Sequence, residues 1–339
     1  MNSKRKRWQL PFLLFLIVGT ALILRHHNAP RPYQTNQGKV FGTFYHISYQ
    51  SDEDLQAQIE QALARVDGSL SPFNDTSVIT RINNNQDVVP DSLFMHVFNL
   101  SKLVSKDTNG AFDITVAPLV NAWGFGFKTG IDVDSATVDS LRRFIGIDKV
   151  WSEEARICKQ LDNVMLDCSS VAKGFGCDVV ARLFDARGIA NYMIEIGGEI
   201  VMKGKNSRGG DWTIGINKPV DDSLNQNQEF QSVISLTDKG MATSGNYRNF
   251  YFKDGKKYAH TIDPRTGYPV QRNILSATVV ADDCATADAY ATAFMVLGLD
   301  SAMMVCDRHP EMDAYFIYVD PQGEVTTHAT KGMEKYIKE

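Results

Sequence analysis

The stretch from Tyr258 to Gly298 constrains the fold most, because it predicts a turn, a buried strand and a helix in close succession. The turn is Asp263–Gly267, in which a proline presets one backbone angle and a glycine permits another. Leu275–Ala281 is short, apolar and rich in β-branched residues, which is typical of a buried strand. Either of the two aspartates that follow can cap a helix starting near Ala285.

The predicted helix carries two oxygen-bearing side chains on one face. Asp288 and Thr292 are four residues apart and therefore lie on the same side. Tyr290, Phe294 and Leu297 line a different face, which we expect to pack inward. A carboxylate and a hydroxyl near a helix start are hard ligands suited to Mg²⁺ or Ca²⁺. From spacing alone, an aspartate favoured by the helix dipole beside a packed threonine is the simpler explanation.

Periodicity elsewhere predicts strands and helices in irregular alternation, which favours an α+β fold of antiparallel sheets with packed helices. The predicted helices are Glu53–Val66, Asp91–Lys106 and a short helix capped by Ser135; the predicted strands include Lys39–Tyr49, Asn163–Cys168, Tyr192–Ile196 and Trp212–Ile216. Gly197 and Gly198 follow the third of these strands and predict a tight turn that a ligand can approach. The polar segment Asp221–Glu229 is predicted to be a loop.

Composition excludes several classes of protein. The chain has 339 residues, enough for one large domain or two intimate ones. Its net charge of −5 argues against nucleic acid as a main partner. The five cysteines include no CxxC pair, and their odd number is incompatible with a complete disulfide framework. Neither a P-loop nor a Rossmann glycine motif occurs.

Residues 1–36 are interpreted as an export segment and tether that precede a folded domain at residues 37–339. Basic residues Lys4–Arg7 are followed by the apolar run Leu10–Leu24, which is shorter than the roughly 20 residues of a typical spanning helix. An uncleaved signal anchor is the first interpretation and a cleaved signal peptide the second. The positive-inside rule predicts that the folded domain lies outside the cytoplasm, with His26–Thr35 as a polar tether.

Short motifs follow one another in a fixed order over most of the chain. They are FGTFY at 41–45, LSPFND at 70–75 with SVITRIN at 77–83, GAFDITVAPL at 110–119 with WGF at 123–125, DCSSVAKGFGCD at 167–178, IGGE at 196–199, TSGNYR at 243–248, and HTIDPRTGYP at 260–269 with ADAYAT at 287–292. Together these motifs resemble the ApbE family of flavin transferases, which are FAD-dependent enzymes that move FMN onto a protein threonine. The resemblance extends over about residues 39–317 and implies two intimately associated halves with an FAD cleft between them.

The resemblance implies a set of residues that contact FAD, namely Phe41, Phe73, Ala111, Phe112, Asp113, Asp167, Lys173 and Ile262. Phe41 stands where the family usually has methionine, so a large apolar side chain is kept. Taken by itself, Phe73 is equally well explained as a core aromatic residue. The residues alone would make Phe112 a core side chain, Lys173 a surface residue and the two aspartates caps of turns.

The resemblance also implies one Mg²⁺ or Ca²⁺ held by Ser170, Asp288 and Thr292, with the FAD pyrophosphate completing its coordination. Lys173 lies at a predicted helix start after a serine turn, where backbone N–H groups and its own charge suit a phosphate. His260 is expected to be the base, because it alone of the seven histidines lies in a motif beside a turn, and imidazole titrates near neutrality. A buried histidine that orients the turn is the alternative. Asp288 is expected to take part in catalysis as well as metal binding.

The activity that the resemblance implies is Mg²⁺-dependent transfer of FMN from FAD to a threonine of an exported or membrane redox protein, with release of AMP. The acceptor threonine is expected in a motif of the Asp/Ser-Gly-Ala-Thr type. Two alternatives stay open, namely hydrolysis of FAD to FMN and AMP, and flavin binding without catalysis. With the N-terminal segment in the cytoplasmic membrane, the catalytic domain is expected on the outer, periplasmic face.

Overall fold

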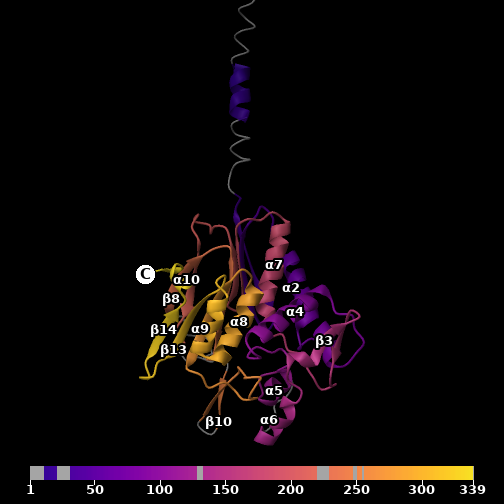
Figure 1. The fold of residues 1–339 in the computed structure, drawn as a ribbon. Helices are drawn as coiled ribbons and strands as arrows, with labels where there is room; N and C mark the ends of the chain where they lie inside the picture. The colour runs from indigo at the N-terminus through magenta and orange to yellow at the C-terminus, as the bar shows by residue number, and fades with distance from the viewer. Residues whose placement is uncertain are drawn as a thin grey trace, which may run out of the picture.

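The computed structural model describes residues 11–20, 31–127, 133–219, 229–246, 250–253 and 256–338. An eight-stranded antiparallel sheet is the largest sheet of the described structure (Figure 1). In spatial order its strands are β1 (Tyr33–Val40), β2 (Thr43–Gln50), β5 (Tyr192–Ile196), β6 (Glu199–Lys203), β9 (Lys239–Gly245), β12 (Ile274–Ala281), β13 (Asp313–Val319) and β14 (Val325–Ala329).

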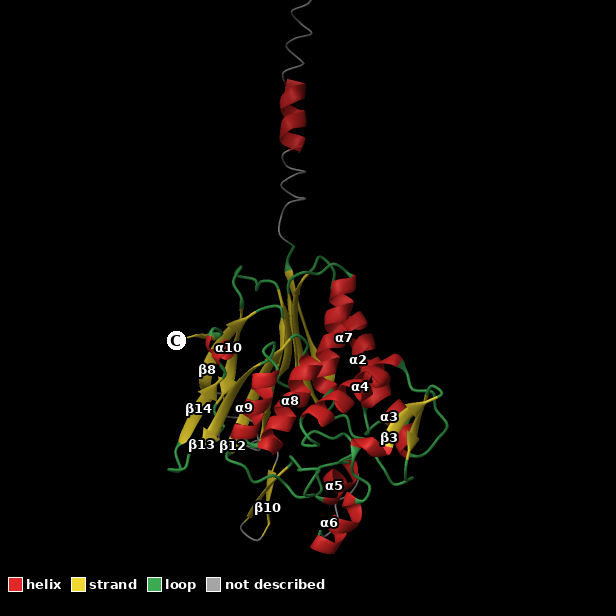
Figure 2. Cartoon of the chain, viewed as in Figure 1, coloured by secondary structure: helices red, strands yellow, loops and turns green. Residues whose placement is uncertain are grey.

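Helices and smaller strand pairs surround this sheet (Figure 2). The helices are α2 (Gln56–Leu70), α3 (Val78–Asn83), α4 (Ser92–Asp107), α5 (Ala117–Ala122), α6 (Ser135–Arg142), α7 (Ala172–Ala186), α8 (Cys284–Leu297), α9 (Leu299–Arg308) and α10 (Lys331–Glu334), with a further helix at residues 11–20. The smaller sheets are β7 (Trp212–Asn217) with β8 (Phe230–Leu236) and β15 (Ile337–Lys338), β3 (Val150–Glu153) with β4 (Arg156–Lys159), and β10 (Phe250–Lys253) with β11 (Lys256–Ala259).

The large sheet is covered on both faces. On one face α8 packs against β9 and β12 and also against α7, and its many alanines are completely buried. Gly240 on β9 permits this close packing, because a side chain there would approach the backbone nitrogen of Cys284 to 2.3 Å. On the other face the β7–β8–β15 sheet supplies Trp212 and Ile234 to a core shared with Ile317 of β13. Apolar side chains of alternating strand positions thus enter two different cores.

Several sequence predictions are confirmed. The fold is α+β with antiparallel sheets, and β5 has the predicted bounds. Asp283 caps α8 by accepting a hydrogen bond from the backbone nitrogen of Thr286. The helix predicted over Asp91–Lys106 corresponds to α4, in which Asp91 is the cap and accepts from the backbone nitrogen of Phe94. An aspartate before an apolar periodic segment is a local signal for a helix start.

The prediction of one strand over Lys39–Tyr49 was wrong. The chain forms a hairpin there, in which β1 and β2 pair antiparallel from Tyr33 with Gln50 to Val40 with Thr43. Phe41 and Gly42 make the two-residue turn with φ angles of 51° and 74°. Positive φ at both central residues is typical of the turns that join twisted antiparallel strands, and the glycine was the missed signal.

Two further local predictions need correction. Asn163–Cys168 is not a strand, because its ladder is limited to a parallel bridge between Met165 and Val116. The cap of α6 is Asp134 rather than Ser135, since the Asp134 side chain accepts from the backbone nitrogen of Thr137. The predicted loop at Asp221–Glu229 lies, except for its last residue, outside the described part of the chain.

The N-terminal region is described only in part. Residues 11–20 are helical, and the apolar side chains from Phe12 to Val18 are exposed. Within the described ranges no helix has both the length and the apolar character needed to cross a bilayer. Strand β1 begins at Tyr33, inside the segment that we interpreted as a tether.

Candidate active site

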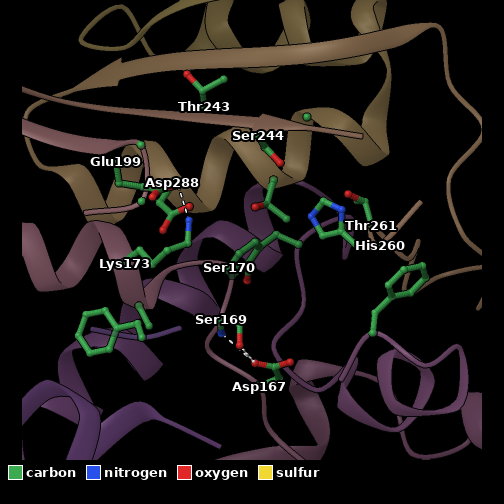
Figure 3. Close-up of a pocket in the computed structure, with 18 of the residues that line it drawn as sticks. Asp167, Ser169, Ser170, Lys173, Glu199, Thr243, Ser244, His260, Thr261 and Asp288 are labelled. Carbon is green, nitrogen blue, oxygen red and sulfur yellow. Dashed lines mark hydrogen bonds and ion pairs between the residues drawn. The ribbon is translucent and has the colours of Figure 1, made fainter. Parts of the chain in front are cut away.

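A cavity of about 570 Å³ collects every residue that the sequence singled out for a site. The twelve are Phe41, Phe73, Ala111, Phe112, Asp113, Asp167, Ser170, Lys173, His260, Ile262, Asp288 and Thr292. They come from turns, helices and loops that are far apart in the sequence, and the close-up in Figure 3 shows several of them directed into the same space. The volume falls within the usual range of roughly 300–1,000 Å³ for small-molecule sites.

Aromatic side chains line one part of the cavity. Phe41 projects from the hairpin turn and packs against Gly176 of α7, where a side chain would approach the ring to 2.7 Å. Phe112 is buried, whereas Phe73 is 69% exposed and makes an edge-to-face contact with Phe127 at 6.2 Å between ring centroids. The core explanation of Phe73 is therefore wrong. An exposed ring beside a cavity offers a surface on which a planar ligand can stack.

The antiparallel crossing of α7 and α8 places the charged residues of the cavity. Asp288 Oδ2 on α8 accepts a hydrogen bond from the backbone nitrogen of Gly174 on α7 at 3.1 Å. In the opposite direction, Asp178 on α7 accepts hydrogen bonds from the backbone nitrogens of Cys284 and Ala285, both at 2.9 Å. Each helix thus supplies a carboxylate to free backbone donors at the start of the other. This mutual capping sets how far Asp288 lies from the first turn of α7.

A lysine and two carboxylates are clustered at this crossing. Lys173 Nζ lies 2.5 Å from Oε1 of Glu199, the first residue of β6. Burial opposes the charge on Lys173, but the neighbouring Glu199 and Asp288 outweigh burial and raise its pKa. Burial raises the pKa of Asp288 as well, and Lys173 acts against that rise. The surface explanation of Lys173 is therefore wrong, since its ammonium group is held at the cavity wall by an ion pair.

Two aspartates on loops support the cavity floor. Asp113 accepts hydrogen bonds from the backbone and hydroxyl of Thr115 and, through Oδ2, from the backbone of Ile147 at 2.8 Å. Asp167 accepts from the backbone nitrogen and hydroxyl of Ser169. Burial raises the pKa of both carboxyl groups against the opposing effect of these hydrogen bonds. Both aspartates act as caps of turns, as the residues alone predicted, and both also line the cavity.

His260 follows β11 and lies beside Ser244 and Thr261 at the cavity in Figure 3. Its half-buried ring meets Phe125 edge-to-face at 6.5 Å between centroids. The turn after it is held through Asp263, which accepts from the backbone and the guanidinium of Arg265 at 2.9 Å. The role of His260 as a base stays a prediction.

The oxygen ligands predicted for a divalent cation, Ser170, Asp288 and Thr292, line the same cavity as Lys173. Over the described ranges no group of three histidine, cysteine or acidic side chains could hold a metal ion. One carboxylate and two hydroxyl-bearing residues form a sparse set of hard ligands. Such a set fits Mg²⁺, which keeps water and takes oxygens from substrate phosphates.

Sequence reasoning missed some of the site. Glu199 was seen only as part of a tight turn that a ligand can approach, and its ion pair with Lys173 was not predicted. Residues 214–217 of β7 also line the cavity, although that strand belongs to the smaller sheet. The two glycines before Glu199 were the available signal for Glu199. No local signal marks residues 214–217, because contacts between two sheets depend on how the whole domain folds.

Comparison with known proteins gives a consistent result. The model of the ApbE family matches residues 41–316. An FAD:protein FMN transferase of Haemophilus influenzae is 38% identical over 306 residues, covering 85% of this chain and 87% of that protein. One of Vibrio cholerae is 35% identical over 303 residues, covering 86% of this chain and 90% of that protein.

Solved structures agree with this similarity. The flavin transferase ApbE from Vibrio cholerae superposes with a TM-score of 0.82 at 33% identity, covering 91% of this chain and all of that one. The apo form of the Pseudomonas stutzeri flavinyl transferase ApbE superposes with a TM-score of 0.80 at 28% identity, covering 91% and 98%. The likeness therefore includes most of the chain.

Proposed function

This chain belongs to the ApbE family, and we propose that it transfers FMN from FAD to a threonine hydroxyl of an exported or membrane redox protein, releasing AMP. The observation that carries the proposal is the convergence of residues from motifs along most of the chain on a single cavity. Aromatic side chains at that cavity suit an isoalloxazine ring. The Lys173 and Asp288 region suits a pyrophosphate with its counter-cation.

The proposed reaction is a substitution at phosphorus. The threonine oxygen attacks the FMN phosphorus, the bond from that phosphorus to the bridging oxygen breaks, and AMP leaves with the oxygen. His260 takes the proton of the attacking hydroxyl. Lys173 lines the same cavity and offsets negative charge on the phosphoryl oxygens.

A divalent cation belongs to this proposal. Ser170, Asp288 and Thr292 would hold Mg²⁺, or Ca²⁺, and the cation would supply positive charge beside the pyrophosphate. These residues bind and orient the pyrophosphate, which is the main requirement of phosphoryl transfer.

The test incubates the full chain with FAD and Mg²⁺, with and without an acceptor domain carrying an Asp/Ser-Gly-Ala-Thr motif. We expect the acceptor to gain the mass of FMN less one water, as an ester requires, and AMP to appear in equal amount. A matched acceptor with alanine in place of the motif threonine should gain nothing. Rapid AMP release without acceptor would identify an FAD hydrolase instead, and FAD left unchanged in both reactions would identify a flavin-binding protein.

We further propose that the N-terminal segment tethers the domain to the outer face of the cytoplasmic membrane. The basic residues before the apolar run support this orientation through the positive-inside rule. Protease added to intact spheroplasts should digest the domain. Protection in intact spheroplasts, with digestion after lysis, would refute the location and leave the proposed activity untouched.

A further inference from the structure

We propose that Glu199 is a positioning residue that engages Lys173 and so leaves the Asp288 carboxylate available to a divalent cation. The inference rests on the cation site of the proposed function and adds a residue to it. Its basis is a cluster of the half-buried Lys173 and two buried carboxylates, of which Glu199 forms the ion pair with the lysine.

The ion pair between Lys173 and Glu199 is held tightly. The two charged atoms lie 2.5 Å apart, and Glu199 is only 3% exposed. Asp288, 5% exposed, instead accepts its hydrogen bond from the backbone of Gly174. The lysine therefore has two possible carboxylate partners at one wall, and the fold directs it to the one that begins β6.

The backbone fixes Glu199 in this position. Gly197 has a φ of 64°, and a side chain there would approach Thr43 to 2.8 Å. The backbone nitrogen of Gly198 donates to Glu195 Oε1 at 2.6 Å, and the other carboxylate oxygen of Glu195 lies 2.9 Å from His46 Nδ1. The tight turn and its hydrogen bonds therefore set the direction in which the Glu199 side chain leaves β6.

The second oxygen of Glu199 gives the cluster its character. In the described structure this atom, Oε2, is buried without a hydrogen-bond partner. A buried carboxylate oxygen left without a partner is unusual, because burial removes its hydration. The cluster contains one ammonium group, that of Lys173, and two buried carboxyl groups. When both carboxyl groups are ionised, the cluster therefore has an excess of negative charge. That excess favours a cation beside Asp288.

Removal of the Glu199 charge has a defined consequence. If Glu199 becomes neutral, Asp288 is the other carboxylate whose charge acts on Lys173. An ammonium group paired with Asp288 competes with a cation for the same carboxylate. Groups that orient a metal ligand typically change metal affinity by about 10- to 100-fold when mutated.

The experiment measures Mn²⁺ binding by electron paramagnetic resonance in the full chain saturated with FAD. Glu199→Gln keeps the side-chain shape and should weaken Mn²⁺ binding by about 10- to 100-fold. In the double variant Lys173→Met/Glu199→Gln no ammonium group remains to pair with Asp288, so the Mn²⁺ affinity should return to that of Lys173→Met alone. Glu199→Asp, which keeps the charge, should bind Mn²⁺ more tightly than Glu199→Gln.

Contrary outcomes are distinguishable. If Glu199→Gln folds, as flavin fluorescence with FAD would show, and binds Mn²⁺ as the wild type does, the inference fails. If the double variant is no better than Glu199→Gln, Glu199 does not act through Lys173 and the inference again fails. Should Glu199→Gln not fold, Glu199→Asp replaces it in the test. The change in Mn²⁺ affinity caused by Glu199→Asp is then measured with Lys173 present and in Lys173→Met. The inference requires the two changes to differ, and equal changes would overturn it. A wild-type protein that transfers FMN without binding Mn²⁺ would instead overturn the cation site.

Discussion

Asp288 on α8 accepts a hydrogen bond from the backbone nitrogen of Gly174 on α7, and the two helices touch at this point. Asp178 returns the contact by accepting from the backbone at the start of α8. The helices can approach this closely because Gly174 has no side chain, and the space that a Cβ atom would need is taken by the backbone carbonyl of Cys284. The geometry of the candidate cation site therefore depends on a glycine that no mechanism would single out.

Gly174→Ala tests this dependence. The added methyl group would meet the carbonyl oxygen of Cys284 at 2.4 Å and Cβ of Asp288 at 2.9 Å, so the helices must separate. We expect a loss of about 1–3 kcal/mol in the free energy of unfolding, measured by urea titration, together with loss of FMN transfer. Gly68→Ala on α2 is the control, since nothing lies within 4 Å of its added methyl group and stability should not fall. Equal behaviour of the two variants would contradict the close contact.

Asp288→Ala tests the proposed cation site. The variant removes the one carboxylate of the predicted ligand set, so FMN transfer should fall at least about 100-fold and should not recover with added Mg²⁺. Transfer is followed by the mass of the acceptor. Asp300→Ala on α9, where the aspartate is exposed, serves as the control and should transfer normally. Full activity of Asp288→Ala in EDTA would remove the residue from the site.

His260→Ala tests the base. Loss of a positioned general base usually costs about 10²- to 10⁴-fold in rate, and we expect FMN transfer to fall by that amount with FAD binding retained. Flavin fluorescence measures the binding and acceptor mass the transfer. His328→Ala replaces an exposed histidine on β14 and should leave both unchanged. Transfer at the wild-type rate in His260→Ala would exclude His260 from the mechanism.

Phe73→Ala separates ligand binding from stability. Because the ring is 69% exposed, its removal should change the free energy of unfolding by less than about 0.5 kcal/mol. If the ring stacks on the flavin, FAD affinity should fall about 2- to 10-fold in a fluorescence titration. Leu103→Ala removes a similarly exposed side chain from α4, at 67%, and should leave FAD affinity unchanged. An unaltered FAD affinity in Phe73→Ala would place the ring outside the flavin site.

Asp107→Asn tests how a carboxylate that does not line the cavity makes the free energy of unfolding depend on pH. Burial acts to raise the pKa of Asp107, but hydrogen bonds from Arg308 and Tyr290 outweigh burial and lower that pKa below its ordinary value. The ionised form is therefore favoured in the folded state, and its contribution is present above the unfolded pKa of about 3.9. It is lost as the pH falls through the lower folded value.

Urea titrations should accordingly show wild type more stable than Asp107→Asn by about 1 kcal/mol at pH 6, with the difference disappearing toward pH 3. Asp300→Asn, which replaces an exposed aspartate, should show no such trend. A difference that grows on acidification would have the wrong sign for a depressed pKa.

Local signals were sufficient for features that depend on neighbouring residues. An aspartate before an apolar segment predicted the start of α8, because a cap acts within one turn of its own helix. Motif resemblance also selected twelve residues that the structure brings together at one cavity, although it did not reveal how they meet. Where two local signals competed, as at Phe41 and Gly42, apolar alternation suggested a strand and the glycine turn prevailed.

Contacts between distant segments depend on the fold as a whole. The ion pair of Glu199 with Lys173 and the mutual capping of α7 and α8 link residues 26 to 114 positions apart. No short-range pattern records such pairs, because they arise when helices pack against the sheet and against each other. The exposure of Phe73 likewise could not be predicted locally, because burial depends on which elements cover a side chain. Local chemistry thus specifies which residues can act, and the packing of the sheet and helices specifies which of them act together.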